Sequence, residues 1–68
     1  MGSKMKVGEI WKYKLSIEEG RIKDITYEWI PVCGEKDYII HFSYFSSPDL
    51  VSRWKRTSFL KKFQKVSK

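Results

Sequence analysis

The chain has few of the residues that small domains use for cross-links or metal sites. Its 68 residues include one cysteine, Cys33, and one histidine, His41. A single cysteine cannot form an intramolecular disulfide, which is typical of proteins from a reducing compartment. One thiol and one imidazole are also too few for a zinc site, which needs about four such ligands. We therefore expect a domain without metal or cofactor, held together by its core.

The sequence also lacks the motifs of common catalytic sites. The four glycines stand at scattered positions and form no phosphate-binding loop. The carboxylates show no pairing typical of glycosidases. A Cys33–His41 nucleophile pair is conceivable, but Cys33 falls in a predicted turn and His41 in a predicted apolar strand. We therefore expect a protein that binds and does not catalyse, with no catalytic residues.

No long hydrophobic run is present. The longest apolar-rich stretch, residues 38–45, is interrupted by His41 and Ser43 and is far shorter than the ~20 residues of a membrane helix. No apolar segment of signal-peptide length follows the charged N-terminus. We therefore expect a cytoplasmic protein without membrane contact. Residues 1–5 are predicted to form a flexible N-terminus and residues 6–68 a single small domain.

Aromatic residues, by contrast, are plentiful at 16% of the chain. A buried aromatic ring removes roughly 150–250 Å² from water, so a few rings can build the core of a chain too short for many aliphatic residues. Most of these rings are therefore expected inside.

Four segments have the alternation or composition of β-strands. Residues 9–17 place Trp11, Tyr13, Leu15 and Ile17 on one face. In residues 21–30, Ile22 is out of phase with the apolar residues that follow, and one extra residue near Lys23 and Asp24, a β-bulge, would restore the phase. Residues 37–45 are apolar on both faces, which predicts a central strand. A fourth strand is predicted over residues 51–57.

The C-terminal segment changes period. Phe59, Leu60, Phe63 and Val66 form a helical stripe over residues 58–66, with lysines on the other side. Thr57 or Ser58 is suited to cap the start of this helix. The helix is short and marginal alone, so we expect Phe59 and Phe63 to plug an open end of the sheet.

Together these segments predict a mainly β fold. The favoured architecture is a small antiparallel barrel of four or five strands, of the Src-homology or Tudor type, closed by the short C-terminal helix, since a barrel removes exposed edges. The alternative is an open curved antiparallel sheet with the helix laid across one face.

Both ends of the chain resemble a loose group of short, uncharacterised phage and bacterial proteins. Residues 7–14 (VGEIWKYK) match an opening of the form G-x-x-W-x-Y-K, and residues 54–56 (WKR) and 58–63 (SFLKKF) are similar to the group's basic and aromatic close. The resemblance implies a small Src-homology-like barrel and a phage or mobile-element origin. It would place the protein in the cytoplasm of a host cell, as a module that binds and modulates a host protein or defence complex.

Charge is concentrated at the C-terminal end. Residues 50–68 carry seven basic and no acidic residues, whereas residues 16–49 carry seven acidic and three basic residues. A basic end favours an anionic partner and predicts a surface for phosphates. Nucleic acid is therefore one candidate partner, bound by Arg53, Lys55, Arg56, Lys61, Lys62 and Lys65.

The aromatic surplus favours a second candidate partner, another protein. Trp, Tyr and Arg most often anchor protein interfaces, and a core this small does not need every ring. We expect an exposed aromatic surface formed by Tyr27, Trp29, Tyr44 and Phe45, through which the chain also has a route to homodimers. The acidic middle of the chain would repel a nucleic-acid backbone, so the protein partner is favoured.

Overall fold

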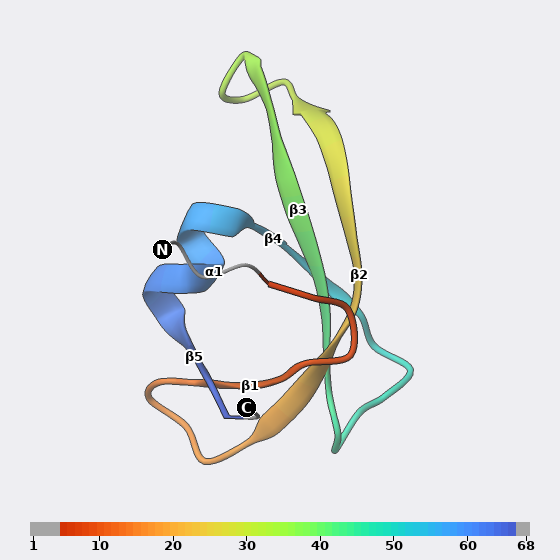
Figure 1. Ribbon diagram of the computed structural model, residues 1–68, viewed down its shortest axis with the longest axis vertical. Helices are drawn as coiled ribbons and strands as arrows, with labels where there is room; N and C mark the ends of the chain where they lie inside the picture. The colour runs from red at the N-terminus through yellow and green to blue at the C-terminus, as the bar shows by residue number, and fades with distance from the viewer. Residues whose placement is uncertain (1–4, 67–68) are drawn as a thin grey trace.

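The structure, a computed structural model, describes residues 5–66 (Figure 1). It is a five-stranded antiparallel sheet with one short helix, which confirms the predicted mainly β class. The elements in chain order are β1 (Ile10–Tyr13), β2 (Glu19–Ile30), β3 (Glu35–Tyr44), β4 (Ser52–Lys55), α1 (Arg56–Lys62) and β5 (Phe63–Lys65). Residues 1–4 of the predicted flexible N-terminus lie outside the described residues, and Met5 packs against the core.

The sheet is not closed into a barrel. Its strand order is β4-β3-β2-β1-β5, and within residues 5–66 no ladder joins the two edge strands β4 and β5. The two longest strands, β2 and β3, form a hairpin that projects beyond the rest of the sheet (Figure 1). The helix α1 packs against β3, β4 and β5. Within the described residues, no helix is long and apolar enough to span a membrane.

The predicted β-bulge in the second strand is confirmed. The register between β2 and β3 shifts between Ile22 and Asp24, so that Lys23 is the extra residue. The bulge allows Ile22, before it, and Ile25, after it, both to face the core: Ile22 is fully buried, and Ile25 packs against the core. The third segment is also confirmed as an interior strand, since β3 pairs with β2 on one side and β4 on the other.

The first strand is shorter than predicted. Pairing ends at Tyr13, where the chain turns and Ser16 N–H bonds back to the Tyr13 carbonyl. Leu15 and Ile17, predicted on the core face, are 88% and 93% exposed in the following loop. Alternation identified the strand correctly but not where its partner strands end.

The C-terminal segment is a helix followed by a strand. The helix α1 spans Arg56–Lys62 and has no side-chain cap, so the capping predicted for Thr57 or Ser58 is wrong. From Phe63 the chain pairs with β1, placing Phe63 opposite Tyr13. Phe59 and Phe63 are buried and stacked 4.3 Å apart, in a core with Trp11, Ile22, Ile40 and Phe42.

Glu9 ties the edge strand β5 to the start of β1. One of its carboxylate oxygens accepts a 3.0 Å hydrogen bond from Trp11 Nε1, and the other lies 3.1 Å from Lys65 Nζ. Burial raises the pKa of Glu9, but the bonds from Trp11, Lys65 and the Lys6 backbone outweigh it and hold the pKa below the ordinary 4.5. The ionised carboxylate is therefore the form that the fold stabilises.

We expect Glu9→Gln to lower the free energy of unfolding by about 1 kcal/mol at pH 7, because the amide keeps an acceptor for Trp11 but loses the charge facing Lys65. A carboxyl whose pKa is depressed by folding stabilises above its unfolded pKa and loses that contribution as the pH falls through its folded pKa. The difference in thermal stability between variant and wild type should therefore shrink as the pH falls through the folded pKa of Glu9 and disappear well below it. Glu19→Gln, at an exposed position, is the control and should match wild type over the same pH range.

Candidate functional site

The inner face of the projecting hairpin continues the core outward. Ile25, Tyr27 and Trp29 alternate along β2 and so share one face. Ile25 pairs with the buried Ile40 of β3, which fixes that face as the core side. One pair further along, Tyr27 stands opposite Tyr38, and Trp29 stands opposite Lys36. The face of β2 and β3 that covers the core therefore continues along the hairpin, where it is open to solvent.

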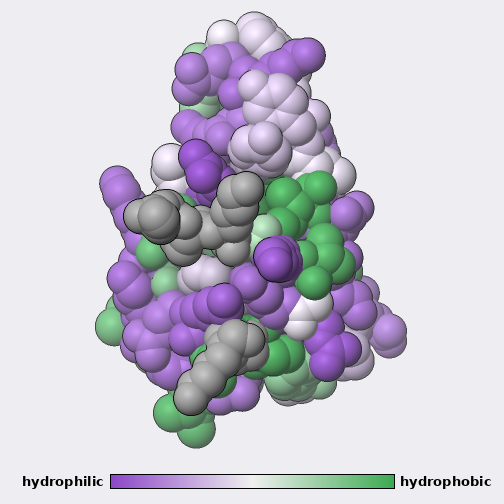
Figure 2. Space-filling view, viewed as in Figure 1, coloured by the Kyte–Doolittle hydropathy of each residue, from purple (hydrophilic) through white to green (hydrophobic). Residues whose placement is uncertain are grey.

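We call Tyr27, Trp29 and Tyr38 the aromatic hairpin face. Their exposed fractions are 59%, 58% and 46%. The rings of Tyr27 and Tyr38 lie 4.8 Å apart, and the Arg56 guanidinium, at the start of α1, lies 5.7 Å from the centre of the Tyr38 ring. Figure 2 shows the projecting hairpin with a pale area, the shade of residues near the middle of the hydropathy scale such as Tyr and Trp. These three half-exposed rings form an aromatic surface, and the Arg56 guanidinium lies beside it.

The opposite face of the hairpin is a polar network. Glu28 accepts hydrogen bonds from Thr26 and Arg53, and Thr26 Oγ1 lies 2.9 Å from His41 Nε2. The hydrogen bond from Thr26, with the charges of Arg53 and His41, holds the pKa of Glu28 below its ordinary value. Glu28, Thr26, His41 and Arg53 therefore already have partners within the chain.

The structure does not gather the predicted basic residues into one free surface. Arg53 pairs with Glu28, and Lys65 pairs with Glu9. Lys55 donates a 3.1 Å hydrogen bond to Cys33 Sγ, and this bond, with the charges of Asp37 and Glu35, raises the pKa of Lys55. Arg56 lies beside the aromatic hairpin face, while Lys61 and Lys62 stand in the last turn of α1.

The four predicted aromatic residues divide into two places. Tyr27 and Trp29 lie together on the aromatic hairpin face, whereas Tyr44 is the last residue of β3 and Phe45 follows it. Tyr44 packs edge-on against Phe42, and burial raises its pKa. Phe45 is exposed, with the Arg21 guanidinium 5.6 Å from its ring.

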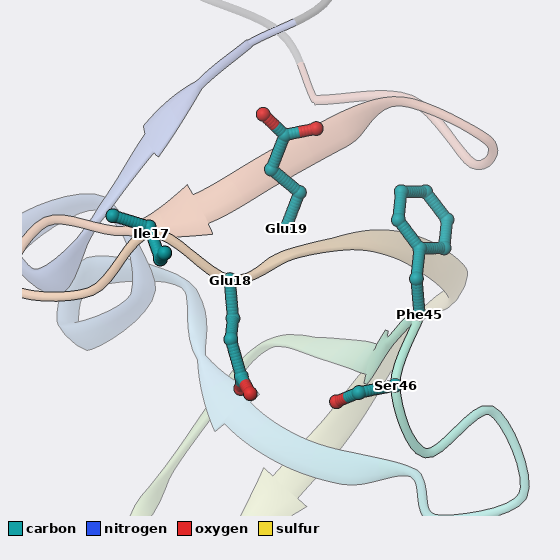
Figure 3. Close-up of a pocket in the computed structure, with 5 residues that line it drawn as sticks. All are labelled: Ile17, Glu18, Glu19, Phe45 and Ser46. Carbon is teal, nitrogen blue, oxygen red and sulfur yellow. The ribbon is translucent and has the colours of Figure 1, made fainter.

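Phe45 lines an open pocket with Ile17, Glu18, Glu19 and Ser46. In Figure 3 the oxygens of Glu18 and Ser46 point toward one another, while Glu19 and Phe45 extend to the other side. Two carboxylates make this pocket unsuited to a phosphate or another anion. Within the part of the chain that the structure describes, no group of three or more potential metal ligands occurs.

Sequence reasoning missed Tyr38 and Lys36 as members of the site. Both follow from pairing: once the turn at residues 31–34 is placed between β2 and β3, the register brings Tyr38 opposite Tyr27 and Lys36 opposite Trp29. Gly34, with a φ of 70°, supplies the left-handed conformation of that turn. The sequence predicted this turn two residues later, at residues 33–36, which placed Lys36 in the turn and left the register across it unpredicted.

In comparisons with known proteins, no family model, no curated protein and no solved structure matches this chain. Its function therefore has to be argued from its surfaces.

Proposed function

We propose that this chain is a non-catalytic binding module that recognises another protein through the aromatic hairpin face. The observation that supports this is the half exposure of Tyr27, Trp29 and Tyr38 on a face continuous with the core. Large rings on a paired sheet lose little conformational freedom on binding and bury much area, which is why Trp and Tyr dominate interface energetics. Arg56 and Lys36 beside the rings favour a partner with acidic side chains around an apolar contact.

We also propose that the curled sheet, with the bulge in β2 and α1 between β4 and β5, acts as a small, partly open barrel of the Src-homology type. Such a scaffold would hold the β2–β3 hairpin rigid while leaving its inner face open. The resemblance of the two chain ends to short phage and bacterial proteins favours a host protein as the partner, one whose activity the module would modulate. Both points stay predictions.

Single-stranded nucleic acid is the second candidate. Arg56 lies over Tyr38, and a cation beside exposed rings is an arrangement that also stacks and holds bases. Against it, Arg53, Lys55 and Lys65 have partners within the chain, so they offer less charge to phosphates. The protein partner therefore remains the favoured one.

We expect Trp29→Ala to weaken partner binding by about 30-fold or more, as truncation of an interface anchor does. The immobilised protein would capture its partner from host lysate near physiological salt, and the affinity of the purified partner would then be measured by calorimetry. Leu15→Ala removes an apolar side chain that is even more exposed and lies outside the aromatic hairpin face, and this variant should bind as wild type.

Equal affinity for the Trp29→Ala and Leu15→Ala variants would contradict this assignment of the site. A parallel titration with short DNA and RNA separates the second candidate, because phosphate contacts weaken steeply with salt whereas an aromatic interface does not. Micromolar oligonucleotide binding that is lost at higher salt and in the Arg56→Glu variant would favour nucleic acid. A melting temperature for each variant confirms that the fold is intact.

A further inference from the structure

Half of strand β2 has an unpaired edge. The strand β1 pairs with β2 only at Glu19–Arg21, and the preceding residues reach it only as far as Ile22. From Ile25 to Ile30, β2 pairs with β3 on one side and, within residues 5–66, with no strand on the other. In Figure 1 this part of β2 forms the outer margin of the projecting hairpin.

The pairing identifies the backbone groups that face outward from this edge. The Ile25 N–H bonds to its neighbour's carboxylate, Asp24 Oδ1, at 2.9 Å, so it points away from β3. Residues of an antiparallel strand alternate between facing one neighbour and the other. Tyr27 and Trp29 therefore direct their N–H and C=O groups to the same open side as Ile25.

The two edges of the hairpin differ in charge. Beyond the end of β4, the edge of β3 carries Glu35, Lys36 and Asp37, and the Tyr38 N–H is capped by Asp37 Oδ1 at 2.7 Å. Such charges protect a strand edge from pairing. Residues 25–30 of β2, by contrast, read ITYEWI, without Lys or Pro, although Asp24 beside them holds the Ile25 N–H as Asp37 holds that of Tyr38. Their one charge, Glu28, is held by Arg53 and Thr26 on the outer face.

We propose that a second copy of this chain pairs with this open edge, antiparallel, with Tyr27 opposite Tyr27 of the second copy. In this register Trp29 stands opposite Ile25, and Glu28 stands opposite Thr26, so no two like charges meet. The N–H groups of Tyr27 and Trp29 donate to carbonyls of Tyr27 and Ile25 across the two-fold axis. The segment is self-complementary, as a symmetric dimer interface requires.

This pairing goes beyond the proposed function and does not depend on it. Edge pairing uses backbone groups, so the side chains of the aromatic hairpin face stay on the surface of the sheet. The two copies join into one sheet with the order β3-β2-β2-β3. The aromatic hairpin faces of the two copies then lie next to each other and form a larger docking surface.

Sedimentation equilibrium over a range of concentrations tests the dimer. A ladder of five residues per copy is smaller than a standard interface. We therefore expect mostly dimer at protein concentrations of roughly 0.1–1 mM and mostly monomer at about 1 μM. The average mass of wild type should rise from 8.2 kDa toward twice that value. Amide exchange of the Tyr27 and Trp29 N–H groups should slow over the same range, which tests the edge without any substitution.

Charge-swapped variants test the register. Tyr27→Lys and Tyr27→Glu each place like charges directly opposite one another at the two-fold axis, so each alone should remain at 8.2 kDa. An equimolar mixture of the two variants should recover the dimer. Tyr38→Lys alters the same aromatic face one strand away from the edge and should dimerise as wild type does.

A wild-type protein that stays monomeric at about 1 mM would overturn the proposal. So would a mixture that fails to recover the dimer, or a Tyr38→Lys variant that loses it, since the second result would place the contact on the aromatic face. Loss of the dimer leaves the proposed function separately testable, because the Trp29→Ala comparison measures binding of a different protein to the monomer.

Discussion

Replacing Phe42 with alanine is expected to lower the free energy of unfolding by about 3–5 kcal/mol, the usual cost of removing a buried aromatic ring. Phe42 is completely buried, and its ring centre lies within 5.5 Å of those of Tyr44, Phe59 and Phe63. A small domain has a total stability near the lower end of about 5–15 kcal/mol. The variant should therefore be largely unfolded at 37 °C. Urea unfolding followed by tryptophan fluorescence measures the loss.

Phe45→Ala is the matched control for this experiment. Phe45 is the same residue type three positions along the chain, but it is exposed, with the Arg21 guanidinium 5.6 Å from its ring. We expect it to change stability by less than about 1 kcal/mol. Similar losses at both positions would show that the ring cluster around Phe42 is not the centre of the core.

The middle of the fold could be predicted from the sequence because its signals are local. Alternation located β2, and a segment that is apolar on both faces located β3. The out-of-phase Ile22 located the bulge, since a change of phase within one strand has few other causes. Burial of Phe59 and Phe63 was also predictable, because large rings spaced four residues apart need a common core.

The two ends of the fold were harder to predict because distant pairing decides them. The same spacing of Phe59 and Phe63 suits a continuous helix, yet the chain leaves the helix at Phe63 to pair with β1. That exchange replaces helical hydrogen bonds with sheet hydrogen bonds and keeps both rings buried. The predicted burial of Leu15 and Ile17 is wrong for the same reason, because alternation shows which residues suit one face and does not show where a partner strand ends.

The sequence predicted the kinds of residue that form the candidate site, but it did not predict all of the residues that belong to it. Tyr27 and Trp29 share a face by alternation alone, whereas Tyr38 joins them only through the register of the hairpin. Tyr44 was included because a strand that is apolar on both faces does not reveal which end the core covers. Three of the six basic residues proved to be engaged with Glu28, Cys33 or Glu9, contacts that sequence spacing does not encode.

Gly20 lies against β3 where a side chain would not fit. A Cβ atom at this position would lie 2.3 Å from the Ser43 carbonyl oxygen, 2.6 Å from Phe42 Cζ and 2.8 Å from Tyr44 Cα. Two of these three atoms belong to the backbone of β3, so they can move only if the strand moves. The absence of a side chain at Gly20 is therefore a packing requirement of the sheet and not one of backbone conformation.

We expect Gly20→Ala to lower the free energy of unfolding by about 1–3 kcal/mol or more, which is the usual cost of overpacking. The NMR signals of the Phe42 ring should broaden. Gly34→Ala is the comparison: it adds the same methyl group where nothing lies within 4 Å, and costs only the strain of a φ of 70°, about 1–2 kcal/mol. Urea unfolding of the two variants and of wild type measures both costs. If Gly20→Ala proved the milder change, β2 and β3 would have to separate easily at this point, and the close packing of Gly20 against Ser43 and Tyr44 would not be a requirement of the sheet.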